Sequence, residues 1–299
     1  MVNRAFLLLV LLWCIHSVFS LPSERRKRIN ETVFIDGKCP GDPELEKMVR
    51  TQGTRTLMYI ISYNNASEYV ANQYASCRQD WVKVIRIPLT KFYESSIYFY
   101  LDSHRQEWRT YQYVVISTYK SLTPSLLHPS LPPQTFESIK QMLILAQNDI
   151  ADVYPFVRGN QRLLNATVGY HGEEFGSAWQ TILSYVGLTS DQIGKCNEMY
   201  PFYRNLYMAK PHILERLVNS MKKVFRATIQ NKELGRVLEA DARYRLGAPR
   251  IAQKIFGSSY YQLHPFLFQL LPPCIFRLLG ARICIAPLGQ CGVNYYYEG

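Results

Sequence analysis

The sequence of 299 residues predicts an α/β fold, in which a mostly parallel sheet is covered by helices and a more helical part follows. Apolar runs of strand length alternate with amphipathic segments of helix length, which is the pattern of βα units. The composition is 47% hydrophobic, which is enough for a large core. The sequence contains neither an internal repeat nor a low-complexity tract, so we expect one globular domain.

Three segments are predicted to be strands of this sheet. Residues 57–62 and 113–117 are continuous apolar runs that end in serine, which is typical of strands buried on both faces. Residues 81–87 alternate between apolar and polar side chains and stop at Pro88. Tyr119 and Lys120 follow the third strand, at the carboxyl end where open α/β sheets place their ligands.

Helices are predicted between and after these strands, at residues 67–76, 91–101, 136–146 and 173–187. The strongest helical pattern begins near Pro211, a residue that is tolerated in a first helical turn. Its apolar face is formed by Ile213, Leu214, Leu217, Val218, Met221, Val224 and Phe225. We expect this helix to pack on the core.

The N-terminus has the pattern of a secretory leader. Arg4 precedes an apolar run at residues 5–15, and a small-residue cleavage site ends at Ser20. The run is shorter than the roughly 20 residues that a helix needs to cross a bilayer, although a retained anchor stays an alternative. We therefore expect a signal peptide or signal anchor at residues 1–20, a basic lead-in at 21–50 and a single domain at 51–299. Membrane attachment is expected only if the N-terminal segment is retained.

Cysteines and glycosylation sequons agree with passage through the secretory pathway. Removal of residues 1–20 leaves an even number of cysteines, which predicts disulfides rather than a zinc site. They are Cys39, Cys77, Cys196, Cys274, Cys284 and Cys291. Asn30, Asn65 and Asn165 each begin an N-x-S/T sequon. The predicted location is the Golgi or ER lumen, or the extracellular space.

The formal net charge of +11 favours an anionic partner. Nucleic acid is not expected in the secretory lumen, which leaves nucleotide phosphates, acidic glycans or an anionic membrane surface. A basic surface with no dedicated partner is an equally plain interpretation.

Polar residues inside an aromatic run suggest a binding site at residues 201–211. Arg204 and Asn205 precede the predicted helix that begins near Pro211, so they would be presented from a rigid support. The alternative is a structural turn capped by Asn205.

Scattered carboxylates are the candidates for chemistry, because the sequence lacks the common phosphate-loop, zincin and nucleophile-elbow motifs. Glu94, between inward-facing Tyr93 and Ile97, could act as a base or make a buried structural hydrogen bond. Asp149 and Asp152 have oxygen ligands suited to Mg²⁺ or Mn²⁺, but acids near a strand end are commonly solvated. His171, just before a predicted helix, is interpreted either as a phosphate contact or as a cap.

Five short blocks follow one another along the chain. They are an E-x-x-x-Y helix at residues 94–98, a Y-V-x-x-x-x-Y-K strand end at 113–120, an Asp-Val-x-Pro turn at 152–155, an N-L-Y-M block at 205–208 and a closing block at 256–270. Taken in this order, they resemble those of nucleotide-diphospho-sugar (GT-A-like) glycosyltransferases, similar to capsular-polysaccharide-type transferases and their algal and protist relatives. The likeness covers roughly residues 57–276.

This resemblance implies transfer of a sugar from a nucleotide-sugar donor to a glycan or protein acceptor, with Mn²⁺ or Mg²⁺ as the implied metal. Glu94, Tyr119 and Lys120 would lie at the donor crevice, and Asp149 or Asp152 near the diphosphate. Lys120 and Arg204 would neutralise the leaving diphosphate.

The chain departs from the family pattern at two places. It has Gln269-Leu270 where the family shows Glu-Arg, and it lacks a clear D-x-D motif. A catalytically inactive relative that binds glycans or a partner is therefore the alternative, and a cysteine-stabilised binding protein with an accidental likeness is a third.

Overall fold

A computed structural model describes residues 43–62, 68, 71–72, 75, 80–87, 92–118, 135–156, 162–163, 165, 168, 173–185, 187–202, 206–239, 262–285 and 290–292. The chain divides into two compact units, and residues 1–41 and 123–133 of the first lie outside the described residues. The description below concerns the second unit, residues 42–122 and 134–299.

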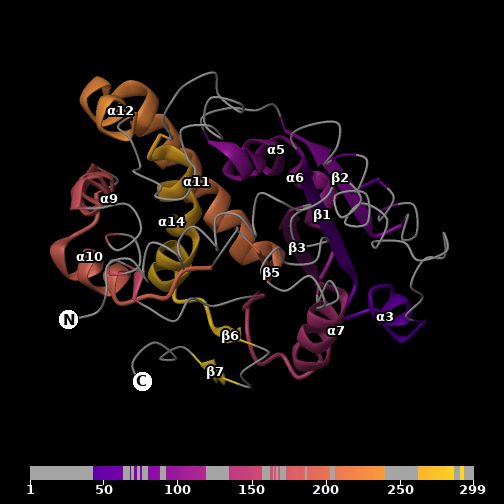
Figure 1. Ribbon diagram of the computed structural model, residues 1–299. Helices are drawn as coiled ribbons and strands as arrows, with labels where there is room; N and C mark the ends of the chain where they lie inside the picture. Colours follow the sequence, from indigo (N-terminus) through magenta and orange to yellow (C-terminus); the bar gives the residue numbers. More distant parts are fainter. Residues whose placement is uncertain are drawn as a thin grey trace, which may run out of the picture. The chain divides into compact units, whose positions relative to one another are not determined.

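Seven strands form one sheet within the described part of the chain (Figure 1). They are β1 (Thr56–Ser62), β2 (Val82–Arg86), β3 (Tyr113–Thr118), β4 (Val153–Pro155), β5 (Tyr207–Ala209), β6 (Ile283–Ile285) and β7 (Gln290–Gly292). Their order across the sheet is β2-β1-β3-β5-β4-β6-β7.

Most of these strands point the same way. β1 is parallel to both β2 and β3, and β4 is parallel to β6. β5 runs antiparallel to both of its neighbours, β3 and β4, and β7 runs antiparallel to β6. The sheet is thus mixed but mostly parallel in direction, which confirms the predicted α/β fold.

Helices cover the sheet and make up most of the described residues after β5. They are α3 (Pro43–Met48), α5 (Ile97–Ser103), α6 (Arg105–Trp108), α7 (Thr135–Ala146), α9 (Glu173–Tyr185), α10 (Ser190–Asn197), α11 (Pro211–Gln230), α12 (Lys232–Leu238) and α14 (His264–Leu278), with the 3₁₀ turn η2 (Tyr93–Ser96) before α5. The predicted strands and the helices at 136–146, 173–187 and after Pro211 are confirmed. Most of the helix predicted at 67–76 lies outside the described residues.

One face of the sheet packs against α7. The Tyr113 hydroxyl at the start of β3 donates a hydrogen bond to the carbonyl of Ala146, the last residue of α7, at 3.3 Å. The Tyr113 ring also meets the ring of Tyr154 edge to face, at 6.2 Å between centroids. Successive strand residues point to opposite faces, so Val115 and Ser117 share this face with Tyr113.

The other face packs against α5, α11 and α14 (Figure 1). Tyr207 on β5 contacts Phe276 of α14 edge to face, with ring centroids 5.3 Å apart. Phe92 makes similar contacts with Phe225 of α11 and Phe268 of α14, at 4.8 and 5.1 Å. These aromatic contacts join η2, α11 and α14 into one core.

α11 buries the face that its sequence pattern predicts. All seven apolar side chains of that face are buried, and Pro211 occupies the first turn. Because the backbone N–H of Leu214 donates to the carbonyl of Lys210, the helix begins directly after β5.

Three segments differ from expectation. Residues 207–209, which lie inside the candidate binding segment 201–211, form β5, a fully buried strand in the middle of the sheet. α14 continues through Pro272 and Pro273, although proline disfavours a helix interior, and β6 and β7 follow it. α3 lies within the range predicted as the basic lead-in, and its Leu45 is fully buried.

Cysteines join the helical part. Cys196 of α10 and Cys274 of α14 form a disulfide. This bond links two helices whose cysteines are 78 residues apart in the sequence. Cys284 of β6 is also disulfide-bonded, and its Cα partner in the ladder is Cys291 of β7. Cys39 and Cys77 lie outside the described residues. Within the described chain, no helix is long and apolar enough to span a membrane.

A buried pair of tyrosines allows a test of this packing. The hydroxyls of Tyr98 and Tyr207 are 2.9 Å apart and hydrogen-bonded, and burial raises the pKa of both. We expect Tyr207→Phe to lower the free energy of unfolding by about 1–3 kcal/mol, because the Tyr98 hydroxyl stays buried without this partner. Urea unfolding should show that Tyr98→Phe/Tyr207→Phe recovers most of the loss. A double variant as unstable as the sum of the two single variants would contradict this pairing.

Candidate functional site

The carboxyl ends of β1 and β3 form a topological switch point. The chain leaves β1 for β2 on one side and then returns past β1 to β3 on the other. Ligands of open α/β sheets bind outside the carboxyl ends of strands at such a reversal. This edge is therefore the first candidate site.

Buried polar side chains gather at this edge. Ser62 ends β1, and Ser117 and Thr118 end β3; all three have no exposed surface. The preceding strand residues 57–61 and 113–116 are buried and apolar or aromatic. A change from apolar to polar residues at the carboxyl edge is what a binding site on this fold requires.

A charged pair lies at the end of the neighbouring strand. Arg86, the last residue of β2, has Ser62 as its Cα partner in the ladder. Its guanidinium donates a hydrogen bond to the Glu68 carboxylate, and both side chains are partly exposed. An exposed pair of this kind contributes little to stability.

Of the residues predicted to bind the donor, two follow β3 in the sequence, two precede β5, and one precedes α9. Tyr119, Lys120, Arg204, Asn205 and His171 lie outside the described residues. Ile116 of β3 pairs with Tyr207 of β5, and the strands are antiparallel, so β5 begins at the edge where β3 ends. The two predicted donor segments are therefore joined to one edge of the sheet.

Glu94 lies in η2, the turn that follows β2 and precedes α5. Its side chain is half-buried, and Phe92 two residues before it packs on Phe225 and Phe268. Ser95 and Ser96 in the same turn are buried as well. Glu94 thus belongs to the carboxyl side of the sheet.

Asp149 and Asp152 lie at the other end of the strands, in a cluster with two cations. Lys210 Nζ donates to Asp149 and, at 3.0 Å, to Asp152 Oδ1. Arg282 donates to Asp152 through its backbone N–H at 3.0 Å and its Nη2 at 3.2 Å. The Asp152 side chain is 12% exposed, whereas the Asp149 side chain is 72% exposed.

The cations set the charge state of this cluster. Partial burial alone would raise the pKa of the Asp152 carboxyl, but hydrogen bonds from Arg282 and Lys210 outweigh burial and hold the pKa at about 2. The hydrogen bond from Lys210 also lowers the pKa of Asp149. Burial, followed by these two carboxylates, raises the pKa of the nearby Tyr113 hydroxyl to about 12.

The structure does not bring Glu94 and Asp152 together. Asp152 contacts Lys210, which directly precedes the first residue of α11. Phe92, two residues before Glu94, contacts Phe225 near the other end of α11. Pro211 and Phe225 are separated by about 21 Å, since a helix rises about 1.5 Å per residue. A distance on the order of 20 Å is too long for two carboxylates to act on one bond.

The two aspartates do not fit a divalent metal site. Their oxygens are engaged by Lys210 and Arg282, and two cations beside them would repel a metal ion. Among the described residues, no group of three or more His, Cys, Asp or Glu side chains is arranged to hold a metal. We therefore derive no metal-dependent step from this cluster.

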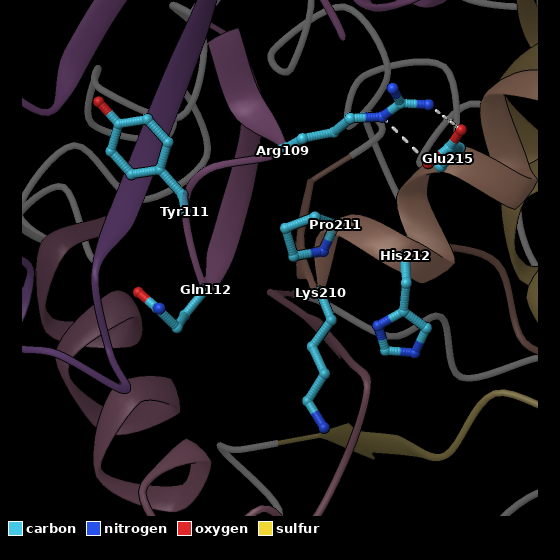
Figure 2. Close-up of a pocket in the computed structure, with 7 residues that line it drawn as sticks. All are labelled: Arg109, Tyr111, Gln112, Lys210, Pro211, His212 and Glu215. Carbon is cyan, nitrogen blue, oxygen red and sulfur yellow. Dashed lines mark hydrogen bonds and ion pairs between the residues drawn. The ribbon is translucent and has the colours of Figure 1, made fainter. Parts of the chain in front are cut away.

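An open pocket of about 350 Å³ lies at the start of α11 and was not anticipated from the sequence (Figure 2). Arg109 and Lys210 line it, but Arg109 Nε donates to Glu215 at 3.1 Å and Lys210 reaches the two aspartates. Both cations are thus engaged by carboxylates, so this pocket has no marked preference for an anion. Gln112 and His212 complete much of its wall.

The predicted glycosylation site at Asn165 is exposed in the structure. Asn30 and Asn65 lie outside the described residues. Use of these sequons stays a prediction.

Sequence reasoning missed Ser62, Lys210 and Arg282. Ser62 had a detectable signal, because it is a polar residue at the end of an apolar run of strand length. Lys210 and Arg282 had none, since they lie 58 and 130 residues from Asp152 and meet it only in the fold.

Comparison with known proteins adds no relative: no family model, curated protein or solved structure matches the chain.

Proposed function

We propose that the chain is a glycosyltransferase-like protein of the secretory pathway that binds a nucleotide sugar at the carboxyl ends of β1 and β3. It would transfer the sugar to a glycan or protein acceptor. Support comes from the ordered sequence blocks together with the arrangement of the sheet.

The pairing of β3 with β5 carries this proposal. Two blocks of the resemblance, at residues 113–120 and 205–208, are far apart in sequence, yet their strands are neighbours with Ile116 opposite Tyr207. Because the strands are antiparallel, the ends that carry the predicted donor residues adjoin the same edge. An accidental likeness gives no reason for the two blocks to meet in this way.

In the proposed transfer, the bond from the sugar to the diphosphate breaks as an acceptor oxygen bonds to the same carbon. The acceptor proton passes to a base, for which Glu94 is the candidate on this side of the sheet. Lys120 and Arg204 would offset the charge that develops on the diphosphate. Asp152 has no part in this scheme, because it lies at the opposite end of the strands.

The departures at Gln269-Leu270 and the missing D-x-D motif favour a second candidate. In that case the chain is an inactive relative that binds glycans or a partner protein in the same compartment.

Thermal unfolding of the full chain with UDP, GDP and their common sugar conjugates tests the proposal. A nucleotide at 100 times its dissociation constant should stabilise the fold by about 2.7 kcal/mol. We expect one base to be selected, and the selected sugar conjugate to be consumed when acceptor is added. Stabilisation without turnover would favour the inactive relative, and no stabilisation by any nucleotide would contradict the proposed site.

A further inference from the structure

Ser62 has an unusual environment for a hydroxyl group. It is the last residue of β1, its side chain has no exposed surface, and its Oγ finds no hydrogen-bond partner among the described residues. The backbone carbonyl of Ser62 is satisfied, because it accepts a hydrogen bond from the N–H of Ile87 at 2.9 Å. The strand pairing is therefore regular, and it is only the side chain that has no partner among the described residues.

A buried hydroxyl without a partner destabilises a fold, and alanine at the same place would not. Thr56 at the opposite end of β1 shows that the strand can satisfy such a group. Its side chain is equally buried, and its hydroxyl donates to the carbonyl of Thr54 at 2.7 Å. Among the described residues, the hydroxyl at the amino end of β1 thus has a partner, and the hydroxyl at its carboxyl end has none.

The position of Ser62 indicates what the missing partner is. Ser62 lies between Arg86 at the end of β2 and the end of β3, at the reversal of strand order. In such sheets, the nucleotide part of a ligand binds at the carboxyl end of the first strand. A nucleotide offers oxygen and nitrogen acceptors, and a serine hydroxyl donates one hydrogen bond.

We propose that the Ser62 hydroxyl binds the nucleotide part of the donor by donating a hydrogen bond to it. This inference rests on the proposed function, and it assigns to Ser62 a role in binding and none in the transfer step. The nucleotide would supply a partner that the described residues do not offer to this hydroxyl.

The test compares Ser62→Ala with Thr56→Val in the full chain. The probe is UDP or GDP, whichever stabilises the wild type, and the readouts are the unfolding temperature without nucleotide and the dissociation constant from calorimetry. We expect Ser62→Ala to unfold at the wild-type temperature or above it, and to bind nucleotide at least tenfold more weakly. Thr56→Val should unfold at a lower temperature and bind with the wild-type dissociation constant.

Two results would overturn the inference while leaving the proposed function intact. One is nucleotide binding by Ser62→Ala with the wild-type dissociation constant. The other is a lowered unfolding temperature of Ser62→Ala without nucleotide, or its failure to fold, since either shows that the hydroxyl supports the fold itself. If the wild type binds neither UDP nor GDP, the proposed function and the role of Ser62 fail together.

Discussion

Replacing Cys196 and Cys274 together with alanine is expected to lower the free energy of unfolding by about 4–5 kcal/mol. The disulfide closes a loop with a sequence separation of 78 residues, and in the chain-entropy model a loop of this length restricts the unfolded chain by about that amount. Both cysteines are fully buried, so the bond is also shielded from solvent. Denaturant unfolding of the wild type and the double variant under non-reducing conditions measures the difference.

Reductant provides the control for this experiment. Dithiothreitol should destabilise the double variant only through the remaining disulfides, which include that of Cys284. In the wild type, dithiothreitol should lower the free energy of unfolding by the contribution of those disulfides and, in addition, by that of the Cys196–Cys274 bond. A double variant within 1 kcal/mol of the wild type would show that α10 and α14 are held by packing alone.

The strands and helices with clear periodicity were predictable because their patterns are local. β1 and β3 are apolar runs long enough to be identified from composition, and α11 repeats its apolar face over several turns. β5 has three residues, which is too short for a strand pattern. Its structure comes from pairing with β3 and β4, which are distant in sequence.

α14 shows a second limit of local patterns. Pro272 and Pro273 lack the N–H groups that a helix interior uses, so a helix through them is locally disfavoured. The helix continues because its apolar side chains are buried against α10, α11 and η2, and the disulfide at Cys274 ties it to α10. Tertiary packing overrides the local preference.

The position of the candidate site could be predicted from the sequence, but the surroundings of its residues could not. The carboxyl end of β3 follows from strand order and direction, and the donor-binding role of the residues after it stays a prediction. The role given to Asp149 and Asp152 depended on which groups surround them, and these include Lys210, directly after β5, and Arg282, directly before β6. Residue types alone do not distinguish a metal ligand from a carboxylate that is already paired with a cation.

Asp152→Asn is expected to lower the free energy of unfolding by about 2.5 kcal/mol at pH 7. The carboxyl pKa falls from its ordinary value of 3.8 to about 2 in the fold, and each pKa unit corresponds to about 1.36 kcal/mol. The Asp152 side chain is 12% exposed, so solvent screening is limited. Asp149→Asn is the matched control, because Asp149 meets the same two cations but is 72% exposed, and it should change stability only slightly.

The pH dependence identifies the charge of Asp152 as the cause. A carboxyl with a lowered pKa in the fold stabilises it fully above the unfolded pKa near 3.8, and this contribution is lost as the pH falls toward 2. The stability difference between wild type and Asp152→Asn should therefore be constant from pH 7 to about 5 and shrink from about pH 4 to 2. Urea unfolding at each pH measures it. A difference that stays constant down to pH 2 would mean that the variant disturbs packing and that the ion pairs with Lys210 and Arg282 contribute nothing.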